Sequence, residues 1–221
     1  MSQLKFPDGF LWGAATASHQ VEGNTTNDWS EWEKQNADRL AQEAQSKFGH
    51  IKYWERLRPE AEDPMNYISG EACDHYHRFR EDFDIAKSLH HNAHRFSIEW
   101  SRIEPTEGVF DEKAIAHYRD VLSALHERGI TPFVTLWHWT LPLWLRDKGG
   151  VASKQFPAYF ERYTRHVVGK LHDQVKFWIP LNEPTSVIAG AYTTGAWPPQ
   201  KKSYILAYRV SHILADAHKR A

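Results

Sequence analysis

Four short apolar runs alternate with segments of helical periodicity, and this alternation restricts the fold more than any other feature of the chain. The runs cover residues 10–17, 93–100, 130–138 and 175–181. Each is followed by a helical pattern, and the later units span about 40 residues each. Strands that alternate with helices form parallel sheets through right-handed crossovers. The sequence therefore predicts an α/β fold in which outer helices cover a parallel sheet.

Local signals mark where several helices begin and end. Asp111 suits a helix N-cap, and Gly129 fits the C′ position of the same helix. Pro157 suits the first turn of the next helix, and Ser203 leads the last one. Four strand–helix units make either a small open sheet or half of a (β/α)8 barrel, and periodicity leaves both possibilities open.

A long polar segment interrupts the first unit. It runs over about residues 22–72, carries little periodicity, and contains one helical stretch near residues 31–45. Loops of this length inside compact domains are usually functional or mobile. We expect a single domain over residues 1–221, with this segment inserted between the first strand and the first helix.

The amino-acid composition limits the kinds of molecule that we expect the chain to bind. The chain has 27 Lys and Arg against 28 Asp and Glu, so it has no basic excess for nucleic acid. We find no apolar run long enough to cross a bilayer and no signal peptide, so we expect a cytoplasmic protein without a membrane partner. The 14 His lack metal-site spacing, and nucleotide-binding glycine motifs are missing. We therefore expect no metal and no cofactor.

The fourth apolar run ends in Asn182-Glu183-Pro184. We expect a strand buried on both faces, and Pro184 ends it because proline cannot donate to a ladder. Glu183 would then lie on rigid backbone at a cleft, where apolar surroundings keep a general acid protonated. The alternative is a surface carboxylate in a salt bridge.

Polar side chains also follow the other strands. Gln20 comes after the first run, His138 and Trp139 end the third, and Asn182 ends the fourth. The second run places Arg95, Ser97 and Glu99 on one face by its period of two. In a (β/α)8 barrel the carboxyl ends of the strands form the active site. Gln, His and Asn there could bind sugar hydroxyls, and the ten Trp could stack on sugar rings, although core packing explains most single Trp equally well.

These stretches resemble glycoside hydrolase family 1, the retaining β-glucosidases and their relatives. The matching segments are FPDGFLWGAATASHQVEG, HRFSIEWSRIEP, ITPFVTLWHWTLPLWL and VKFWIPLNEP. The resemblance implies a (β/α)4 half of a TIM (β/α)8 barrel that hydrolyses O-glycosyl bonds with retention. It implies Glu183 as acid/base, and Gln20, His138, Trp139 and Asn182 as substrate-binding residues, with Arg95 beneath the seat of the nucleophile.

The chain also departs from the family pattern. The nucleophile of the family lies in a Thr-Glu-Asn-Gly motif on the seventh strand, and we find no such motif here. Thr140 stands where the family usually has Asp. Retention needs two carboxyl groups about 5–5.5 Å apart. Glu99 is the only other candidate, and we expect it to form an ion pair with Arg95 instead of attacking the sugar.

We therefore expect weak or absent activity from the chain alone. Full activity would need a second half, supplied by a homodimer or larger assembly through open barrel edges, or by a separate C-terminal half-barrel. The substrate would be a β-glycoside or a small sugar. The alternative is a non-catalytic carbohydrate-binding or assembly protein derived from such a barrel.

Overall fold

A single parallel sheet of four strands organises the molecule. The computed structural model describes residues 5–221. The strands are β1 (Gly13–Ala15), β2 (Ala93–Ser97), β3 (Thr131–Trp137) and β4 (Phe177–Leu181), and they lie in chain order across the sheet. Each new strand is added at the same edge, as in a (β/α)8 barrel; in a doubly wound sheet the strand order reverses.

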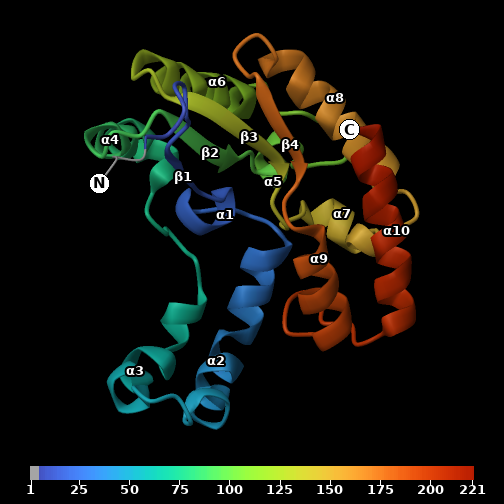
Figure 1. Cartoon of the computed structure of the whole chain (residues 1–221). Helices are drawn as coiled ribbons and strands as arrows, with labels where there is room; N and C mark the ends of the chain where they lie inside the picture. The colour runs from blue at the N-terminus through green and yellow to red at the C-terminus, as the bar shows by residue number, and fades with distance from the viewer. Residues whose placement is uncertain (1–4) are drawn as a thin grey trace.

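Helices cover one face of this sheet, while others lie beyond its edges (Figure 1). The α-helices are α1 (Ser18–Val21), α2 (Asp28–Phe48), α3 (Trp54–Ala61), α4 (His75–Ser88), α5 (Trp100–Ile103), α6 (Glu112–Glu127), α7 (Leu143–Asp147), α8 (Phe156–Leu171), α9 (Pro184–Val187) and α10 (Tyr204–Arg220). Two 3₁₀ helices, η1 (Pro64–Tyr67) and η2 (Gly150–Ala152), and a π-helix, η3 (Ile188–Thr194), complete the chain.

The predicted helix ends are confirmed. The Asp111 carboxylate accepts hydrogen bonds from the first backbone amides of α6, and Ser203 Oγ accepts one from the Leu206 amide at the start of α10. Gly129 follows α6 with a φ of 66°, the left-handed conformation that glycine adopts without strain. Pro157 lies in the first turn of α8.

Three strand predictions need correction. The first strand covers only three residues, all exposed, because the chain before Gly13 runs beyond the edge of the sheet. The second ends at Ser97, since Glu99 already caps α5. The fourth is half-buried along its whole length, not buried on both faces. Its outer face packs on the helices, while the inner face meets no second layer within residues 5–221.

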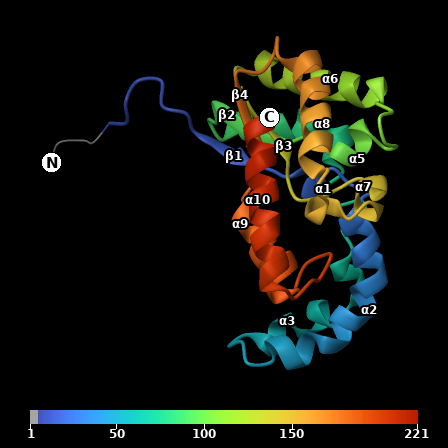
Figure 2. The same ribbon diagram turned by 90° about the vertical axis from the view of Figure 1, so that its right-hand side faces the viewer.

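The main core lies between the sheet and the outer helices. α6 packs on β3 and on α4 and α8, while α10 runs beside α8 (Figures 1 and 2). Leu122, Leu125, Phe160 and Val167 from these helices are fully buried. Burial of one such side chain contributes about 1.5–3 kcal/mol. This layer therefore stabilises the outer side of the sheet.

The inner face of the sheet is covered less than the outer face. Phe133 and Phe177 stack across β3 and β4 with ring centroids 4.4 Å apart, and both rings remain half-exposed. Central β2 is almost wholly buried, whereas β1 is exposed and β4 is half-buried. Among residues 5–221 the sheet is therefore covered on one side only, and β1 and β4 are its unpaired edges.

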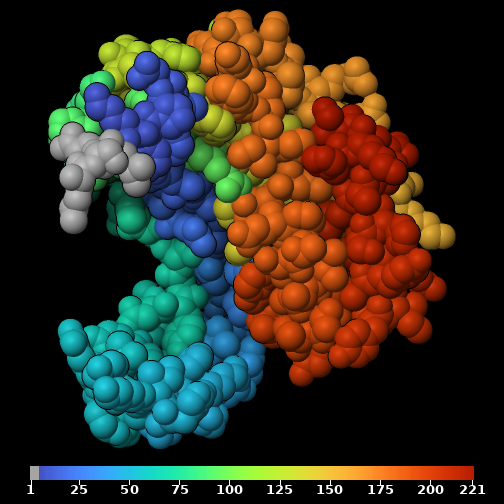
Figure 3. All heavy atoms as spheres, viewed as in Figure 1, coloured from blue at the N-terminus to red at the C-terminus, as the bar shows by residue number. Residues whose placement is uncertain are grey.

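The segment between α1 and α4 projects away from the sheet as an arm of α2, α3 and η1 (Figure 1). Asn27 begins α2 with a reciprocal capping box, in which Asn27 and Ser30 each bond the backbone of the other. Figure 3 shows a wide hollow on one side of the molecule between this arm and the N-terminal strand region. Within the described residues, none of the helices has the length and apolar character that a bilayer span requires.

Candidate active site

The candidate residues follow the carboxyl ends of the strands. Gln20 lies on α1 after β1, His138 and Trp139 follow β3, and Asn182 and Glu183 follow β4. Parallel strands bring these ends to one edge of the sheet. Hydrogen bonds join Arg95, His138, Trp139 and Asn182.

Asn182 is the centre of this group. Its side-chain oxygen accepts a hydrogen bond from Arg95 Nη2, and its Nδ2 donates to His138 Nε2 at 3.1 Å. Arg95 Nε also donates to Thr135 Oγ1 at 2.9 Å. The amide is only 5% exposed. Two fixed partners therefore set the orientation of the Asn182 side chain.

His138 is held as a neutral imidazole. Burial, together with the positive charge of Arg95, lowers the pKa of His138 to about 4. The neighbouring negative charges of Glu183 and Glu99 act in the opposite direction. Because Nε2 accepts from Asn182, Nδ1 carries the proton, and this buried atom has no partner within residues 5–221.

Trp139 has a left-handed backbone, with a φ of 77°. Its indole Nε1 donates to the backbone oxygen of Asn182 at 3.0 Å. The ring lies 6.1 Å from the ring of Trp29 in a stacked arrangement and 4.8 Å from that of Trp197. This hydrogen bond ties the loop after β3 to the end of β4.

Glu183 also has a left-handed backbone, with a φ of 39°. Such a conformation costs about 1–3 kcal/mol in a residue other than glycine and is concentrated at functional sites. The carboxylate is exposed and accepts a hydrogen bond from Ser186 Oγ at 2.9 Å. The apolar surroundings expected for Glu183 are therefore not observed within residues 5–221, and the alternative of a surface salt bridge is not observed either, since we find no ion pair of Glu183 there. Gln20 is likewise exposed.

The expected ion pair of Arg95 with Glu99 is wrong. Arg95 bonds Thr135 and Asn182, whereas Glu99 turns toward α1 and α2 and is fully buried. The Glu99 carboxylate accepts hydrogen bonds from the side chains of Ser18, Asn27, Ser101 and Thr140. Arg95 and Glu99 are therefore not paired, because Glu99 lies beyond the end of β2 and no longer follows its alternation.

Sequence reasoning missed a buried group beneath the strand ends. Glu22 forms an ion pair with Arg102 at 2.9 Å and accepts a hydrogen bond from the Tyr118 hydroxyl at 2.8 Å. Burial raises the pKa of Glu22 to about 7, although Arg102 opposes this shift. No local signal could have revealed the group, since Glu22 and Tyr118 are 96 residues apart in sequence.

His19 belongs to a second missed cluster, with Glu33 at 2.9 Å and Thr25 at 3.0 Å. Burial acts to lower the pKa of His19, but Glu33 and other carboxylates outweigh it and the pKa is raised. Across residues 5–221, no three or more His, Cys, Asp or Glu side chains are grouped so as to hold a metal ion.

Comparisons with known proteins match this chain to one family. The sequence profile described as Glycosyl hydrolase family 1 matches residues 2–221. Beta-glucosidase A of Thermotoga maritima is 38% identical over the whole chain, which covers 46% of that protein. Beta-glucosidase 42 of Arabidopsis thaliana is 37% identical over 98% of the chain, which covers 41% of that protein. The chain thus spans about half the length of the curated relatives it matches.

Solved structures give the same result. A beta-glycosidase from Pyrococcus horikoshii superposes with a TM-score of 0.80 at 38% identity, over 99% of this chain and 45% of that one. A beta-glucosidase from Thermotoga maritima in complex with castanospermine gives a TM-score of 0.77 at 35% identity, over 98% and 45%. The predicted (β/α)4 half of a TIM barrel is confirmed. With its profile match, its relatives and its fold in agreement, this chain belongs to glycosyl hydrolase family 1.

Proposed function

We propose that this chain provides the acid/base half of a retaining β-glycosidase site. Glu183 protonates the glycosidic oxygen, while Gln20, His138, Trp139 and Asn182 bind the sugar. The observation that carries the proposal is the position of Glu183: it stands in a strained backbone directly after Asn182, whose amide Arg95 and His138 hold in place. Such preorganisation is typical of residues that touch a substrate.

The fixed amide keeps hydrogen-bonding capacity for a sugar. Asn182 retains one amide hydrogen after its bond to His138, and a sugar hydroxyl can accept it. His138 Nδ1 is buried, so the imidazole supports this contact by holding the Asn182 amide through Nε2. Glu183 can then lose its proton to the departing oxygen and recover it from water in the second step of the retaining route.

A second carboxylate must supply the attack, and we propose that it comes from a separate C-terminal half-barrel. Glu99 is a poor nucleophile because it is fully buried and its oxygens accept four side-chain hydrogen bonds. A second copy of this chain is also a poor source. In a two-fold dimer its third strand would occupy the seventh position, and that strand ends in residues 137–140, which include no carboxylate.

The test is to assay a chromogenic β-glucoside with the chain alone and with an added C-terminal half of Beta-glucosidase A from Thermotoga maritima. We expect turnover below about 1 s⁻¹ for the chain alone and a clear gain with the added half. Turnover above that rate, in a preparation that mass spectrometry shows to lack any full-length enzyme, would contradict the need for a partner.

Glu183→Gln serves as the variant for the acid/base role. It should abolish most of the restored activity on glycosides with poor leaving groups and reduce it much less on dinitrophenyl glycosides, which need little protonation. General acid catalysis is worth about 10²–10⁴-fold. Equal losses on both substrates would contradict the assignment of Glu183 as the acid/base.

The alternative function is a non-catalytic one. Sugar binding without turnover in the presence of the added half would favour this alternative. The exposure of Glu183 in this half is also consistent with it.

A further inference from the structure

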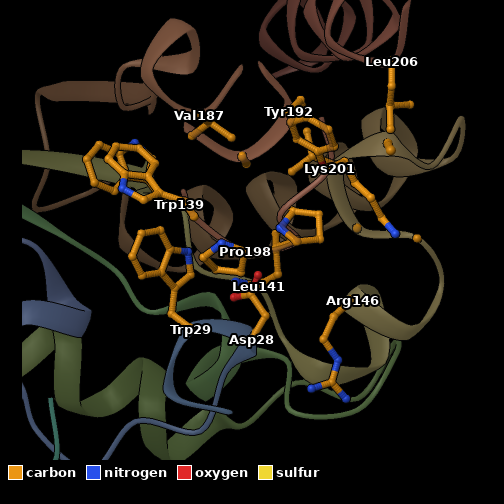
Figure 4. A pocket seen from close by; sticks show the side chains of 17 residues that line it. Asp28, Trp29, Trp139, Leu141, Arg146, Val187, Tyr192, Pro198, Lys201 and Leu206 are labelled. Carbon is orange, nitrogen blue, oxygen red and sulfur yellow. Dashed lines mark hydrogen bonds between the residues drawn. The ribbon is translucent and has the colours of Figure 1, made fainter. Parts of the chain in front are cut away.

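A cavity of ≈ 300 Å³ lies between the loop after β3, the start of α2 and the segment from α9 to α10. Trp139, whose indole Nε1 bonds the Asn182 oxygen, is the one residue that the lining shares with the sugar-binding group, and no residue assigned above to general acid catalysis lines the cavity. Figure 4 shows side chains from both loops turned toward one space. Its volume is at the lower end of the range for small-molecule sites, about 300–1,000 Å³.

Indole rings form much of the wall. Trp29, Trp139 and Trp197 line the cavity, and their ring centroids lie 4.8–6.1 Å apart. Trp29 and Trp139 lie together on one side of the space in Figure 4. The three rings are only half-buried, so they present apolar surface to the cavity. Such a wall favours a flat aromatic ligand, since aromatic pairs gain about 0.5–1.5 kcal/mol beyond area burial.

Two basic residues, Lys201 and Arg146, line the cavity. Lys201 is exposed and has no ion-pair partner in the stretch from residue 5 to the C-terminus, while its backbone amide is anchored to the Ala191 oxygen at 2.8 Å. Arg146 is paired with Asp147 at 2.8 Å, and both side chains are partly exposed. Lys201 is thus a free cation beside the aromatic wall within this stretch, while Arg146 shares its charge with Asp147.

Asp28 is the acidic residue of the lining. Its carboxylate accepts the Leu141 amide at 2.7 Å, and the Asp28 amide bonds the Leu141 oxygen in return. Burial raises the pKa of Asp28 to about 7, so this group carries less than a full negative charge near neutral pH. Lys201 therefore supplies the positive charge of the lining that has no partner within residues 5–221, Arg146 adds guanidinium N–H donors although its charge is shared with Asp147, and the lining is complementary to an anion.

We propose that this cavity binds a flat aromatic carboxylate, with the ring against Trp29, Trp139 and Trp197 and the carboxylate at Lys201 and Arg146. The site is separate from the sugar-binding residues, apart from the shared indole of Trp139. It does not depend on the chain having glycosidase activity.

Three probes that share one ring test the charge preference: indole-3-acetate, indole-3-acetamide and tryptamine. Their binding to the full chain is measured by isothermal titration calorimetry and by saturation-transfer NMR. We expect indole-3-acetate to bind about threefold or more tightly than the neutral amide, and tryptamine to bind most weakly, because two partly exposed cations contribute modest pair energies. Equal affinities for all three probes, or tightest binding of tryptamine, would overturn the proposal.

Lys201→Gln should weaken indole-3-acetate about two- to fivefold and leave indole-3-acetamide unchanged. Lys154→Gln is the matched control, since Lys154 is exposed and does not line the cavity. Ala152→Leu, which adds a side chain to the cavity wall, should reduce binding of all three probes. If Lys201→Gln had no more effect than Lys154→Gln, or if none of the probes bound at millimolar concentration, the assignment would be wrong.

Discussion

Glu99 shows how one buried side chain can hold several elements together. Its carboxylate accepts hydrogen bonds from Ser18 after β1, Asn27 at the start of α2, and Thr140 after β3. The distances are 2.9, 3.3 and 3.0 Å. The residue is fully buried, so water cannot replace these bonds. Glu99 is therefore a positioning residue for the loops that carry Gln20 and His138.

Glu99→Ala should lower the free energy of unfolding by about 2–4 kcal/mol, because it leaves buried donors without an acceptor. Urea denaturation measures the loss. Glu107→Ala is the control, since Glu107 is partly exposed and paired only at the surface with Lys148. We expect little change there. Similar effects of the two substitutions would contradict the role of the buried carboxylate.

His94 should make the protein less stable in acid. Burial, together with the nearby His75 and His91, lowers the pKa of His94 to about 4. The unfolded chain therefore binds more protons between pH 6.5 and 4, and the free energy of unfolding decreases as the pH falls through this window. Asp28 and Glu22 act in the opposite sense: their pKa values are raised to about 7, so their contribution is lost as the pH rises toward 7.

The variant His94→Gln tests how much His94 contributes to the change of stability with pH. The free energy of unfolding of the variant, minus that of the wild type, should be larger at pH 4.5 than at pH 7 by on the order of 2 kcal/mol. Denaturation midpoints measured across this range give the difference. The exposed His50, changed to Gln, should leave the slope with pH unaltered. Parallel curves for His94→Gln and the wild type would disprove the assignment.

At the scale of an element, the π-helix η3 depends on close packing with the chain that follows it. Gly190 lies against the indole of Trp197, and a Cβ at this position would come within 2.4 Å of that ring. The Gly190 oxygen also accepts the amides of Ala196 and Trp197. A glycine here therefore lets the loop fold back over the helix.

Gly190→Ala should displace the Trp197 ring and lower the free energy of unfolding by about 1–3 kcal/mol, as overpacked sites do. Gly169→Ala is the matched control, because Gly169 lies exposed on α8 with no atom within 4 Å of the added Cβ. We expect that control to be neutral or to gain up to about 1 kcal/mol. Chemical denaturation and near-ultraviolet circular dichroism report both changes. Equal stability of the two variants would show that the indole yields without cost.

At the scale of the whole molecule, one face and both edges of the sheet are left without cover by residues 5–221. β1 is exposed, β4 is half-buried, and Phe133 and Phe177 form a partly exposed aromatic pair on the inner face. Unpaired strand edges and exposed apolar patches favour association. The same surface is the one that a complementary half-barrel would cover under the proposed function.

We expect the purified chain to be a dimer or larger at micromolar concentration. Phe177→Glu should shift it toward the monomer, because it places a charge on the inner face of the sheet. Tyr204→Glu is the control, since Tyr204 is 81% exposed on α10, away from that face. Light scattering measures the mass. A monomeric wild type, or an equal shift in both variants, would contradict association through the inner face.

Local chemistry explains how much the sequence determined by itself. Apolar runs gave the four strands and their order, and Asp111, Gly129 and Ser203 marked helix ends, because caps and turns depend on neighbours a few residues away. The strand-end rule for parallel sheets then placed Gln20 and Asn182 on one edge before any contact was known.

Only the tertiary structure decided the buried polar partners. The expected pairing of Arg95 with Glu99 failed because Glu99 instead meets Ser18, 81 residues away, and Asn27, 72 residues away. The exposure of β4 on its inner face likewise depends on what packs there, which an apolar run cannot reveal. Contacts of this kind form between segments that the fold brings together, so their energies leave no pattern in the local sequence.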